Sequence, residues 1–516
     1  MKKETITAGM CIILLIAAGG YWYRDSLKKS QKISELENEC SSLKDQYEDL
    51  LNEYNDLKTQ YEALSGKYTS LKNDLLQDTK NLQGKYDALL KDYTDLKKQY
   101  ETLLENISQK EKHDVLSEEY IPPFGMCQVF WCDAVCRNYT VEAGVKWIRE
   151  DFLWENIEPT KGNFDFSGYD ERVDKALAEG FNIIGICAYN NPWSSGDSAP
   201  HTEQQYQDYA NYVSALVQRY RGKIRYWEIW NEPDARDFWR PIPDPIDYTN
   251  LLKYAYTAAK EADPSVRIIG LGGVDSGNIE YIRTVFQNGG LNYMDILSLH
   301  TYCDPEIYET SPQYLSMEII KNLLSEYDSN IPIWVTEVGY STYSKGVNED
   351  RQAELLVRVY ISLLSEGVEN IIWYRLIDEQ NAPPDDREFH FGILNSDSTP
   401  RKSYYSYKNM ATLLEGYRFS KEYNIGEDCK AVLFKRGMNE KILVLWTYGE
   451  KIDERGNIIS KYEKNISLKI KGDIVNVIDI YGQNVQSWKI KNSILTIKIN
   501  DSPVYIKGNF DIITDS

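Results

Sequence analysis

Several residue patterns that mark common protein classes are missing from this chain of 516 residues. No Cys-x-x-Cys pair occurs among its eight cysteines, so the sequence shows neither a zinc site nor a dense disulfide framework. Cationic side chains are outnumbered, because 58 Lys and Arg face 79 Asp and Glu and give a formal net charge of −21. That balance argues against nucleic acid or an anionic membrane as the main ligand and suits a neutral or cationic one.

Aromatic residues, by contrast, are plentiful. The chain has 40 Tyr and 12 Trp, and flat rings of this kind line sugar-binding clefts. Composition therefore hints at a carbohydrate ligand. Cys132 and Cys136 are placed to pair in an oxidising compartment, whereas most of the other cysteines are expected to be buried and unpaired.

The N-terminal segment Ile6–Tyr23 is apolar and uncharged, follows Lys2 and Lys3, and ends in a Tyr-Trp-Tyr cluster. It is just long enough to span a bilayer. A cleaved secretory signal is the alternative, which would make the protein secreted. We expect an uncleaved single-pass anchor over residues 1–24, with the rest of the chain outside the cell, although lysines and an arginine after the segment favour the opposite orientation.

Residues 25–115 are expected to form a coiled-coil stalk. Tyrosine and leucine alternate at heptad spacing, first at Tyr47, Tyr54, Tyr61 and Tyr68 with Leu50, Leu57, Leu64 and Leu71, and again from Tyr86 to Leu103. The register changes near residues 75–82 by the equivalent of a four-residue stutter. A coiled coil implies a homo-oligomer, and a long helix that folds back on itself is the competing interpretation.

From about residue 120 to 415, strand-like and helix-like segments alternate in a way that predicts a (β/α)8 barrel, with an open doubly wound sheet as the alternative. No Gly-rich phosphate loop follows the first strand, which argues against that alternative. The expected strands are Phe124–Phe130, Val145–Asp151, Phe181–Tyr189, Ile224–Asn231, Val266–Gly270, Met294–Tyr302, Ile331–Gly339 and Asn370–Leu376. Residues 416–516 contain only strands and turns and predict a β-sandwich that braces the barrel.

Reactive residues of a parallel barrel lie at the carboxyl ends of its strands. Glu232 ends the fourth expected strand, IRYWEIWNEP, and Glu337 ends the seventh, IPIWVTEVG. The two carboxylates would then meet across the barrel mouth, as glycoside cleavage requires. Glu228 lies in the same stretch as Glu232, but strand alternation turns it the same way as Trp230, so we expect it lower in the barrel wall, paired with a cation.

The barrel resembles the clan A glycoside hydrolases, most closely family 39 and its relatives that cut bacterial exopolysaccharides, with family 5 as a near neighbour. The motifs that carry the resemblance are VKWIREDFLWENIEPTKGNFDFSGYD, YWEIWNEP, SLHTY, PIWVTEVGY, FGILNSDSTPRKSYYSY and, in the C-terminal region, DSPVYIKG. It extends over residues 122–416 and, through the last motif, to the region beyond.

The resemblance implies that Glu232 is the general acid/base and Glu337 the nucleophile of a retaining mechanism, with carboxyl groups roughly 5–5.5 Å apart. The acid needs surroundings that disfavour its charge, whereas the nucleophile must stay ionised. Among the supporting residues, Arg149 and Tyr302 would hold Glu337 by hydrogen bonds, and Asn231 would bind the sugar 2-hydroxyl.

Three further residues have weaker assignments. By the resemblance, His300 would line the pocket and Trp373 would form its stacking floor. Trp193 is on the loop after the third expected strand, where it would either stack on a neighbouring sugar or simply fix the loop, and the same choice applies to Trp131, Trp154 and Trp239.

The sequence as a whole predicts a cell-surface retaining glycoside hydrolase that acts on a β-linked polysaccharide or oligosaccharide without a metal or an organic cofactor. A catalytically idle barrel that binds glycan within an envelope structure is the alternative, and a purely structural stalk protein is a third interpretation.

Overall fold

The computed structural model describes residues 26–110 and 121–513 of the chain. The long helix α2 (Ser26–Lys110) forms one compact unit, and the chain from Glu119 onward forms the other. The expected membrane segment Ile6–Tyr23 lies outside the described residues. Within the described ranges, no helix combines the length and the apolar character that a bilayer crossing needs.

Helix α2 is continuous over 85 residues, which corresponds to about 130 Å at the usual rise per residue. It runs without interruption through residues 75–82, where a change of heptad register is expected. Heptad side chains between Leu50 and Tyr86 are exposed on this helix, as Leu57 at 68% and Tyr61 at 72% illustrate.

The second unit contains a closed barrel of eight parallel strands, as predicted. Each strand pairs with the next along the chain and β8 pairs with β1. The strands are β1 (Phe124–Cys127), β2 (Trp147–Leu153), β3 (Asn182–Ala188), β4 (Tyr226–Ile229), β5 (Arg267–Asp275), β6 (Ile296–His300), β7 (Ile333–Val338) and β8 (Asn370–Trp373).

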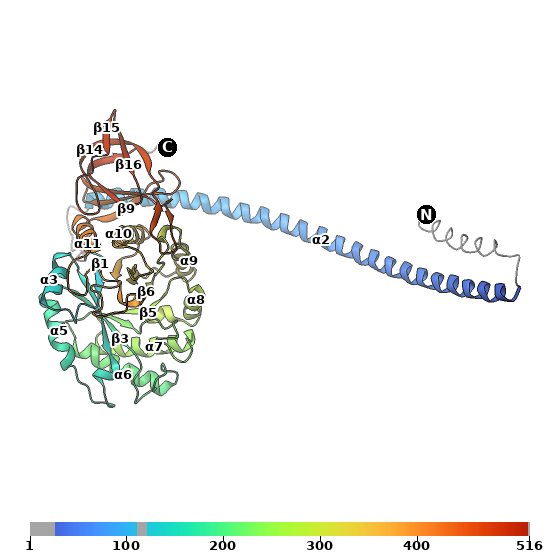
Figure 1. The fold of residues 1–516 in the computed structure, drawn as a ribbon, viewed down its shortest axis with the longest axis horizontal. Coiled ribbons are helices and arrows are strands. Elements are labelled where there is room, and N and C mark those ends of the chain that lie inside the picture. Colours follow the sequence, from blue (N-terminus) through green and yellow to red (C-terminus); the bar gives the residue numbers. More distant parts are fainter. Residues whose placement is uncertain (1–25, 111–120, 514–516) are drawn as a thin grey trace. The chain divides into compact units, whose positions relative to one another are not determined.

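Helices surround this barrel (Figure 1). They are α3 (Ala134–Glu142), the short α4 (Trp154–Ile157), α5 (Ser167–Ala178), α6 (Glu203–Arg219), α7 (Pro245–Ala262), α8 (Ile279–Gln287), α9 (Pro312–Glu326), α10 (Glu349–Ser365) and α11 (Lys402–Leu413). Their starts follow local chemistry, because Thr202 and Gln205 form a capping box at α6 and Asp244 caps α7 before a proline. Short 3-10 turns lie at η1 (Gly290–Tyr293), η2 (Tyr308–Thr310) and η3 (Arg387–Phe389).

The barrel interior is filled in layers. Trp147, Tyr226 and Trp334 lie near the amino ends of β2, β4 and β7, and their rings contact one another with centroids 4.9 to 5.2 Å apart. Above this aromatic layer, the side chains of Arg149 and Glu228 are almost completely buried. This aromatic layer fills the barrel near the amino ends of its strands.

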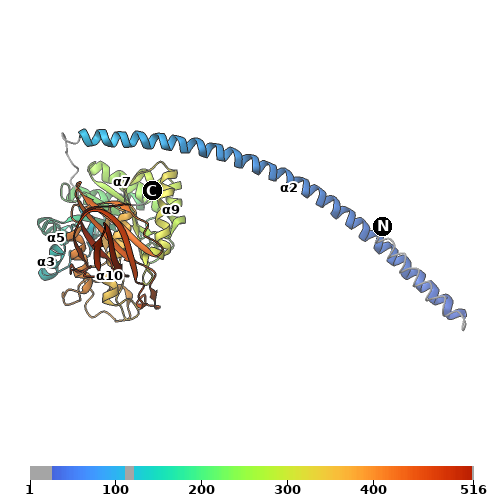
Figure 2. The ribbon, with the colours of Figure 1, turned by 90° about the horizontal axis from the view of Figure 1, so that it is seen from above.

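The C-terminal region differs from the expected sandwich of two separate sheets. Its strands are β9 (Arg418–Glu422), β10 (Cys429–Arg436), β11 (Glu440–Thr447), β14 (Lys464–Ile478), β15 (Trp488–Lys491), β16 (Ile494–Ile499) and β17 (Val504–Ile512), joined in one antiparallel sheet, with β12 (Lys451–Ile452) and β13 (Ile458–Ser460) in a separate ribbon. The long strand β14 is the reason, because its residues 464–469 pair with β16 and its residues 470–478 pair with β17. Figure 2 shows the strands of this region in orange to dark red. A second hydrophobic cluster packs within the region.

Barrel and C-terminal sheet meet through buried charges. Arg358 of α10 is fully buried and donates to both oxygens of Glu309 at 2.9 Å, and it also contacts Glu450. Trp446 of β11 donates to Glu309 at 2.6 Å. The sheet is therefore attached to the barrel by paired charges and hydrogen bonds.

Candidate active site

A cavity of about 940 Å³ opens at the carboxyl ends of the barrel strands. The predicted residues Arg149, Asn231, Glu232, Tyr302 and Glu337 all line it. They come from β2, from β7 and from the segments that follow β4 and β6, so strands far apart in the sequence bring them together.

The end of β4 presents Glu232 through an unusual backbone path. Trp230 and Glu232 have φ angles of 70° and 46°, which lie in the left-handed region. The backbone N–H of Glu232 donates to the Gly272 carbonyl at 2.7 Å, which fixes this turn. Because the chain reverses its alternation here, Trp230 packs outside the barrel against Tyr209, and the side chain of Glu232 lines the cavity.

Glu337 is held by two donors at the end of β7. Arg149 Nη1 donates to its Oε1 at 2.6 Å and the Tyr302 hydroxyl donates to its Oε2 at 2.6 Å. Burial and the negative charge of Glu337 raise the pKa of Tyr302 well above its usual value, so its hydroxyl keeps the proton that it donates. Glu337 is 12% exposed, and each of its two oxygens accepts one hydrogen bond, one of them from a guanidinium.

Arg149 binds three acceptors. Besides Glu337, its Nε donates to Glu228 Oε2 at 2.5 Å and its Nη2 donates to Asn231 Oδ1 at 2.8 Å. Burial alone would lower the pKa of Arg149, but Glu228 and Glu337 raise it well above its ordinary value. Glu228 also accepts from Thr336 at 2.9 Å and is 0% exposed. Its predicted place, deep in the wall and paired with a cation, is confirmed, whereas the argument that it points with Trp230 is wrong.

Glu232 and Glu337 lie close together. One carboxylate oxygen of Glu232, one of Glu337 and one ring nitrogen of His300 all lie within 4.8 Å of one another. This separation agrees with the short spacing of about 5–5.5 Å that accompanies retention and is below the roughly 6.5–9.5 Å of inverting enzymes. Among the described residues this is also the one cluster of at least three donors compact enough for a metal ion, but existing hydrogen bonds engage all three side chains.

We expected His300 to line the pocket, but it is absent from the cavity lining and instead contacts Glu232. Its side chain is 2% exposed, and Nδ1 lies 2.7 Å from Glu232 Oε1 and 3.7 Å from Glu337 Oε2. Burial lowers the pKa of His300, but the charges of Glu337 and Glu232 and the hydrogen bond to Glu232 outweigh it and raise the pKa above its usual value.

The pKa of the Glu232 carboxyl is shifted in the opposite direction to that of His300. Burial raises its pKa, but the hydrogen bond and positive charge of His300, with Arg149 and Arg387 beyond, outweigh burial and lower the pKa below its usual value. The expectation that the surroundings of Glu232 disfavour its charge is therefore wrong for the protein without a ligand.

Trp373 does not lie in the cavity. It is 0% exposed, packs in the hydrophobic core, and its Nε1 donates to the Phe391 carbonyl at 3.2 Å. Strand alternation is the reason, because Ile372 points into the barrel and Trp373 must point out of it. Tyr374, the next residue, lines the cavity instead.

Trp193 is outside the cavity lining as well. Its Nε1 donates to the Glu158 carbonyl at 2.8 Å, and its ring contacts Trp154 edge to face. These contacts match the interpretation that Trp193 fixes its loop. Trp154 and Trp239 are buried, whereas Trp131 is 66% exposed and lines the cavity.

Some cavity residues were not predicted from the sequence. Asp151 follows Arg149 by two positions on β2 and thus shares its face, a periodicity that would have found it. Burial and the charges of Glu337 and Glu228 raise the pKa of Asp151 to about 6, against the effect of Arg149. Neighbouring Glu150 accepts hydrogen bonds from Val129 and Phe130, and its burial raises its pKa to about 8.

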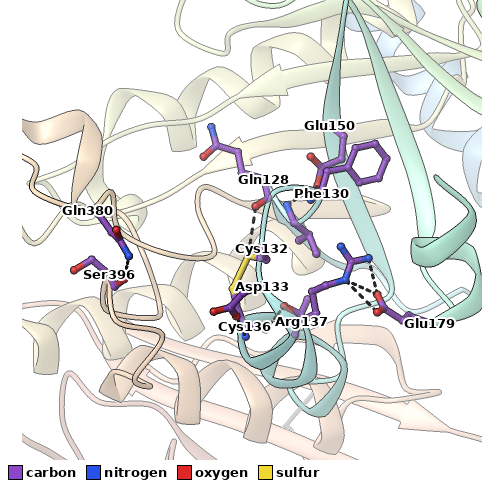
Figure 3. The surroundings of a disulfide bond; sticks show 12 residues. Gln128, Phe130, Cys132, Asp133, Cys136, Arg137, Glu150, Glu179, Gln380 and Ser396 are labelled. Atoms are coloured by element: carbon purple, nitrogen blue, oxygen red, sulfur yellow. Dashed lines mark hydrogen bonds and ion pairs between the residues drawn. A yellow bond between two sulfur atoms is a disulfide. The ribbon is translucent and has the colours of Figure 1, made fainter. Parts of the chain in front are cut away.

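The loop after β1 was also missed, together with α3. A disulfide joins Cys132 and Cys136 where this loop enters α3, as their spacing allowed (Figure 3). Both cysteines line the cavity. Cys127, Cys187, Cys303 and Cys429 are buried and outside any disulfide, as predicted for most of the remaining cysteines.

A closed parallel barrel with two adjacent carboxylates at the ends of β4 and β7 defines a (β/α)8-barrel protein of the clan A glycoside hydrolase type. The model for glycosyl hydrolases family 39 matches residues 193–481, more than half of the chain, and the chain belongs to this family. The resemblance drawn from the motifs is thereby confirmed. A second model, described as beta-galactosidase, matches residues 136–192.

Curated relatives share parts of this sequence. The chain is 24% identical over 314 residues to a beta-xylosidase from Caldicellulosiruptor saccharolyticus, a match that covers 56% of this chain and 61% of that protein. It is 32% identical over 136 residues to endo-1,4-beta-xylanase A from Phanerodontia chrysosporium, which covers 25% of this chain and 32% of the xylanase. The chain thus spans less than two thirds of the length of these relatives.

Solved structures resemble the fold. A family 39 glycoside hydrolase from Bacteroides cellulosilyticus WH2 superposes with a TM-score of 0.63 at 23% identity over 77% of this chain and 82% of that one. A monomeric beta-xylosidase from Caulobacter crescentus CB15 superposes with a TM-score of 0.56 at 14% identity over 75% and 96% of the two chains. At these identities the likeness concerns the fold alone.

Proposed function

We propose that the protein hydrolyses β-linked glycosides with retention of configuration. The observation that carries the proposal is the pair of carboxylates within 4.8 Å, of which Glu337 receives hydrogen bonds from both Arg149 and Tyr302. A binding protein needs no buried guanidinium that holds one carboxylate in place beside a second one.

The first step uses both carboxyl groups. Glu337 attacks the anomeric carbon to form a covalent glycosyl ester, while protonated Glu232 donates its proton to the leaving oxygen. Glu232 then accepts a proton from water, which attacks the same carbon and releases Glu337. Asn231, held by Arg149 at 2.8 Å, is placed to bind the 2-hydroxyl of the sugar.

His300 sets the protonation of the acid in this scheme. Because the partnership with His300 lowers the pKa of Glu232, the free protein holds the donor proton mainly under acidic conditions. Formation of the ester removes the charge of Glu337, which is the main influence that raises the pKa of His300. The pair Glu232 and His300 therefore responds to the state of the nucleophile.

The substrate is a β-linked polysaccharide or oligosaccharide. Support comes from the relatives, which are named as a beta-xylosidase and endo-1,4-beta-xylanases, and from the net charge of −21, which disfavours an anionic polymer. A xylan-type chain is the first substrate to assay.

Substitution of each carboxylate tests the proposal. Glu337→Gln should lower turnover by at least about 10⁴-fold on every glycan, because the nucleophile is lost. Glu232→Ala should retain activity only on aryl glycosides whose leaving group needs no proton. A Glu337→Gln protein that stayed fully active would refute the assignment, and an idle glycan-binding barrel would show no turnover before substitution.

We also propose that the barrel works outside the cell, anchored through Ile6–Tyr23 and separated from the membrane by α2. The Cys132–Cys136 disulfide suits an oxidising compartment. The exposed heptad tyrosines and leucines of α2 suit pairing with other copies of this chain. Protease accessibility of the barrel on intact cells tests the location, and light scattering of residues 26–516 against residues 121–516 tests the oligomer.

A further inference from the structure

The cavity is larger than one sugar unit requires. Its volume of about 940 Å³ is at the upper end of the roughly 300–1,000 Å³ that sites for drug-sized ligands occupy. The catalytic carboxylates line one part of it, and the loop after β1 lines another. The cavity therefore has room for sugar units beyond the one that is attacked.

Trp131, on the loop after β1, is the exposed tryptophan of this lining. Its side chain is 66% exposed, which is unusual for the largest apolar side chain. The guanidinium of Arg172 from α5 covers one face of the indole, with its central carbon 3.8 Å from the ring centroid. The stacked guanidinium orients the ring and leaves the remaining surface for a ligand in the cavity.

The loop that carries Trp131 is fixed on both sides (Figure 3). On one side, the buried carboxylate of Glu150 accepts the backbone N–H groups of Val129 and Phe130. On the other, the Cys132–Cys136 disulfide closes the start of α3, where Asp133 accepts from the Cys136 N–H at 2.8 Å. A ring held in this way loses little conformational freedom when a ligand stacks on it.

Polar groups line the same cavity as the indole. Gln128 and Asp133 from the β1 loop line it, as do Gln380 and Ser396 from the segment after β8. Figure 3 shows Gln380 and Ser396 across from the disulfide, with Gln380 bound to the Ser396 carbonyl at 3.4 Å. An aromatic face combined with amide and carboxylate groups is the chemistry that binds the apolar face and the hydroxyl edges of a pyranose.

The order of strands in the barrel indicates on which side of the cleaved bond the Trp131 site lies. Glu232, which protonates the leaving oxygen, follows β4, and β1 lies between β8 and β2 on the other part of the closed barrel. The leaving sugar occupies the β4 side, so the units that stay linked to the attacked sugar extend toward β8 and β1.

We propose that Trp131 is a stacking platform for a sugar unit on the non-reducing side of the attacked sugar. The inference rests on the proposed glycosidase function and specifies its substrate as a chain with at least two units on that side of the cleaved bond. The protein then releases oligosaccharides rather than single sugars from the non-reducing end.

Two aryl glycosides with the same leaving group test the proposal. The 4-nitrophenyl β-monosides and the matching β-1,4-triosides of xylose, glucose and N-acetylglucosamine are compared through the ratio of kcat/KM for trioside over monoside. In the series that the wild type cleaves best, this ratio should be about tenfold or more, and Trp131→Ala should reduce it to near one. Trp131→Phe, which keeps a flat ring, should restore most of the ratio.

Trp193→Phe is the matched control. Trp193 also follows a barrel strand and has a cation over its ring, Lys161 at 5.4 Å, but lies outside the cavity lining, so the ratio should stay as in the wild type. Cleavage of the aryl glycosides with the same ratio in wild type and Trp131→Ala would overturn the platform alone. Failure to cleave any monoside or trioside would overturn the proposed function and the platform with it.

Discussion

Arg149 is the residue on which the charge of the site depends. Its guanidinium connects Glu228, Glu337 and Asn231, so the same buried cation neutralises a wall carboxylate, holds the proposed nucleophile and orients an amide. A lysine would supply the charge without the fork that reaches three acceptors at once. The arginine at this strand end therefore carries geometric information as well as charge.

His300→Gln tests the influence of the histidine on the acid. Without the cationic ring, the pKa of Glu232 should rise, because His300 is the main influence that lowers it against burial. A higher pKa keeps Glu232 protonated to higher pH, so the basic limb of the kcat/KM profile should move upward. The pH dependence of aryl glycoside cleavage measures this shift.

An unchanged or lowered basic limb in His300→Gln would contradict that assignment of the interaction. Tyr302→Phe serves as a comparison, since it removes a donor to Glu337 and should lower activity without an upward shift of the basic limb.

For individual residues, the sequence predicts which side chains belong to the site better than it predicts which way those side chains point. Glu232, Glu337, Arg149, Asn231 and Tyr302 were found because strand ends and motifs mark them. Strand alternation failed at Trp230, whose positive φ reverses the chain, and it was not applied to Trp373, where it would have pointed to Tyr374. Effects on pKa depend on distances between strands, which one sequence does not contain.

Strand β5 contacts both Glu232 and His300 through its glycines. Its pairing with β6 is irregular between Gly270 and Val274, and the chain there includes Gly272 and Gly273, both with positive φ. The Gly272 carbonyl accepts from Glu232 N–H, and a Cβ on Gly273 would lie 2.1 Å from Nε2 of His300. The bulge thus gives space to the histidine that partners the acid.

Gly273→Ala should therefore impair both stability and catalysis. The added methyl group meets the buried His300 ring, and the φ of 73° is unfavourable for alanine, so we expect a loss of about 2–4 kcal/mol in the free energy of unfolding. Chemical denaturation and kcat/KM measure the two effects.

Gly168→Ala is the control, because no atom lies within 4 Å of its Cβ position and its φ is not positive. A Gly273→Ala protein as stable and active as this control would show that the bulge is not needed for the position of His300.

The elements themselves were largely predictable. The eight strands follow from short β-branched and aromatic runs, and the outer helices from amphipathic spacing, with ends that moved by a few residues. Helix α3 was not identified, because its nine residues lack a strong apolar face. The bulge in β5 and the change of partner along β14 were not foreseen either, since both depend on neighbouring strands.

For the whole molecule, the junction of barrel and C-terminal sheet depends on buried ions. Arg358 lies between Glu309 and Glu450, and Arg351, two turns earlier in α10, donates to Glu450 at 2.5 Å. Burial raises the pKa of Glu309, but the charge and hydrogen bonds of Arg358 outweigh burial and lower the pKa below its usual value. Such an arrangement fixes one way of docking the sheet.

Arg358→Ala should destabilise the unit strongly. The substitution leaves Glu309 without a cation and Glu450 with one fewer, at a cost of about 3–5 kcal/mol. Thermal unfolding monitored by circular dichroism measures the loss. Arg436→Ala removes an exposed pair with Glu440 and should cost about 0–1 kcal/mol; equal effects of the two substitutions would contradict the role of the buried cluster.

Glu337 as a covalent nucleophile is the claim on which the other assignments depend. Incubation with 2-deoxy-2-fluoro glycosides that carry a good leaving group, followed by peptide mapping in a mass spectrometer, tests it most directly. We predict a stable glycosyl adduct on Glu337, lost in Glu337→Gln. An adduct on another carboxylate, or turnover with inverted product and no adduct, would contradict it.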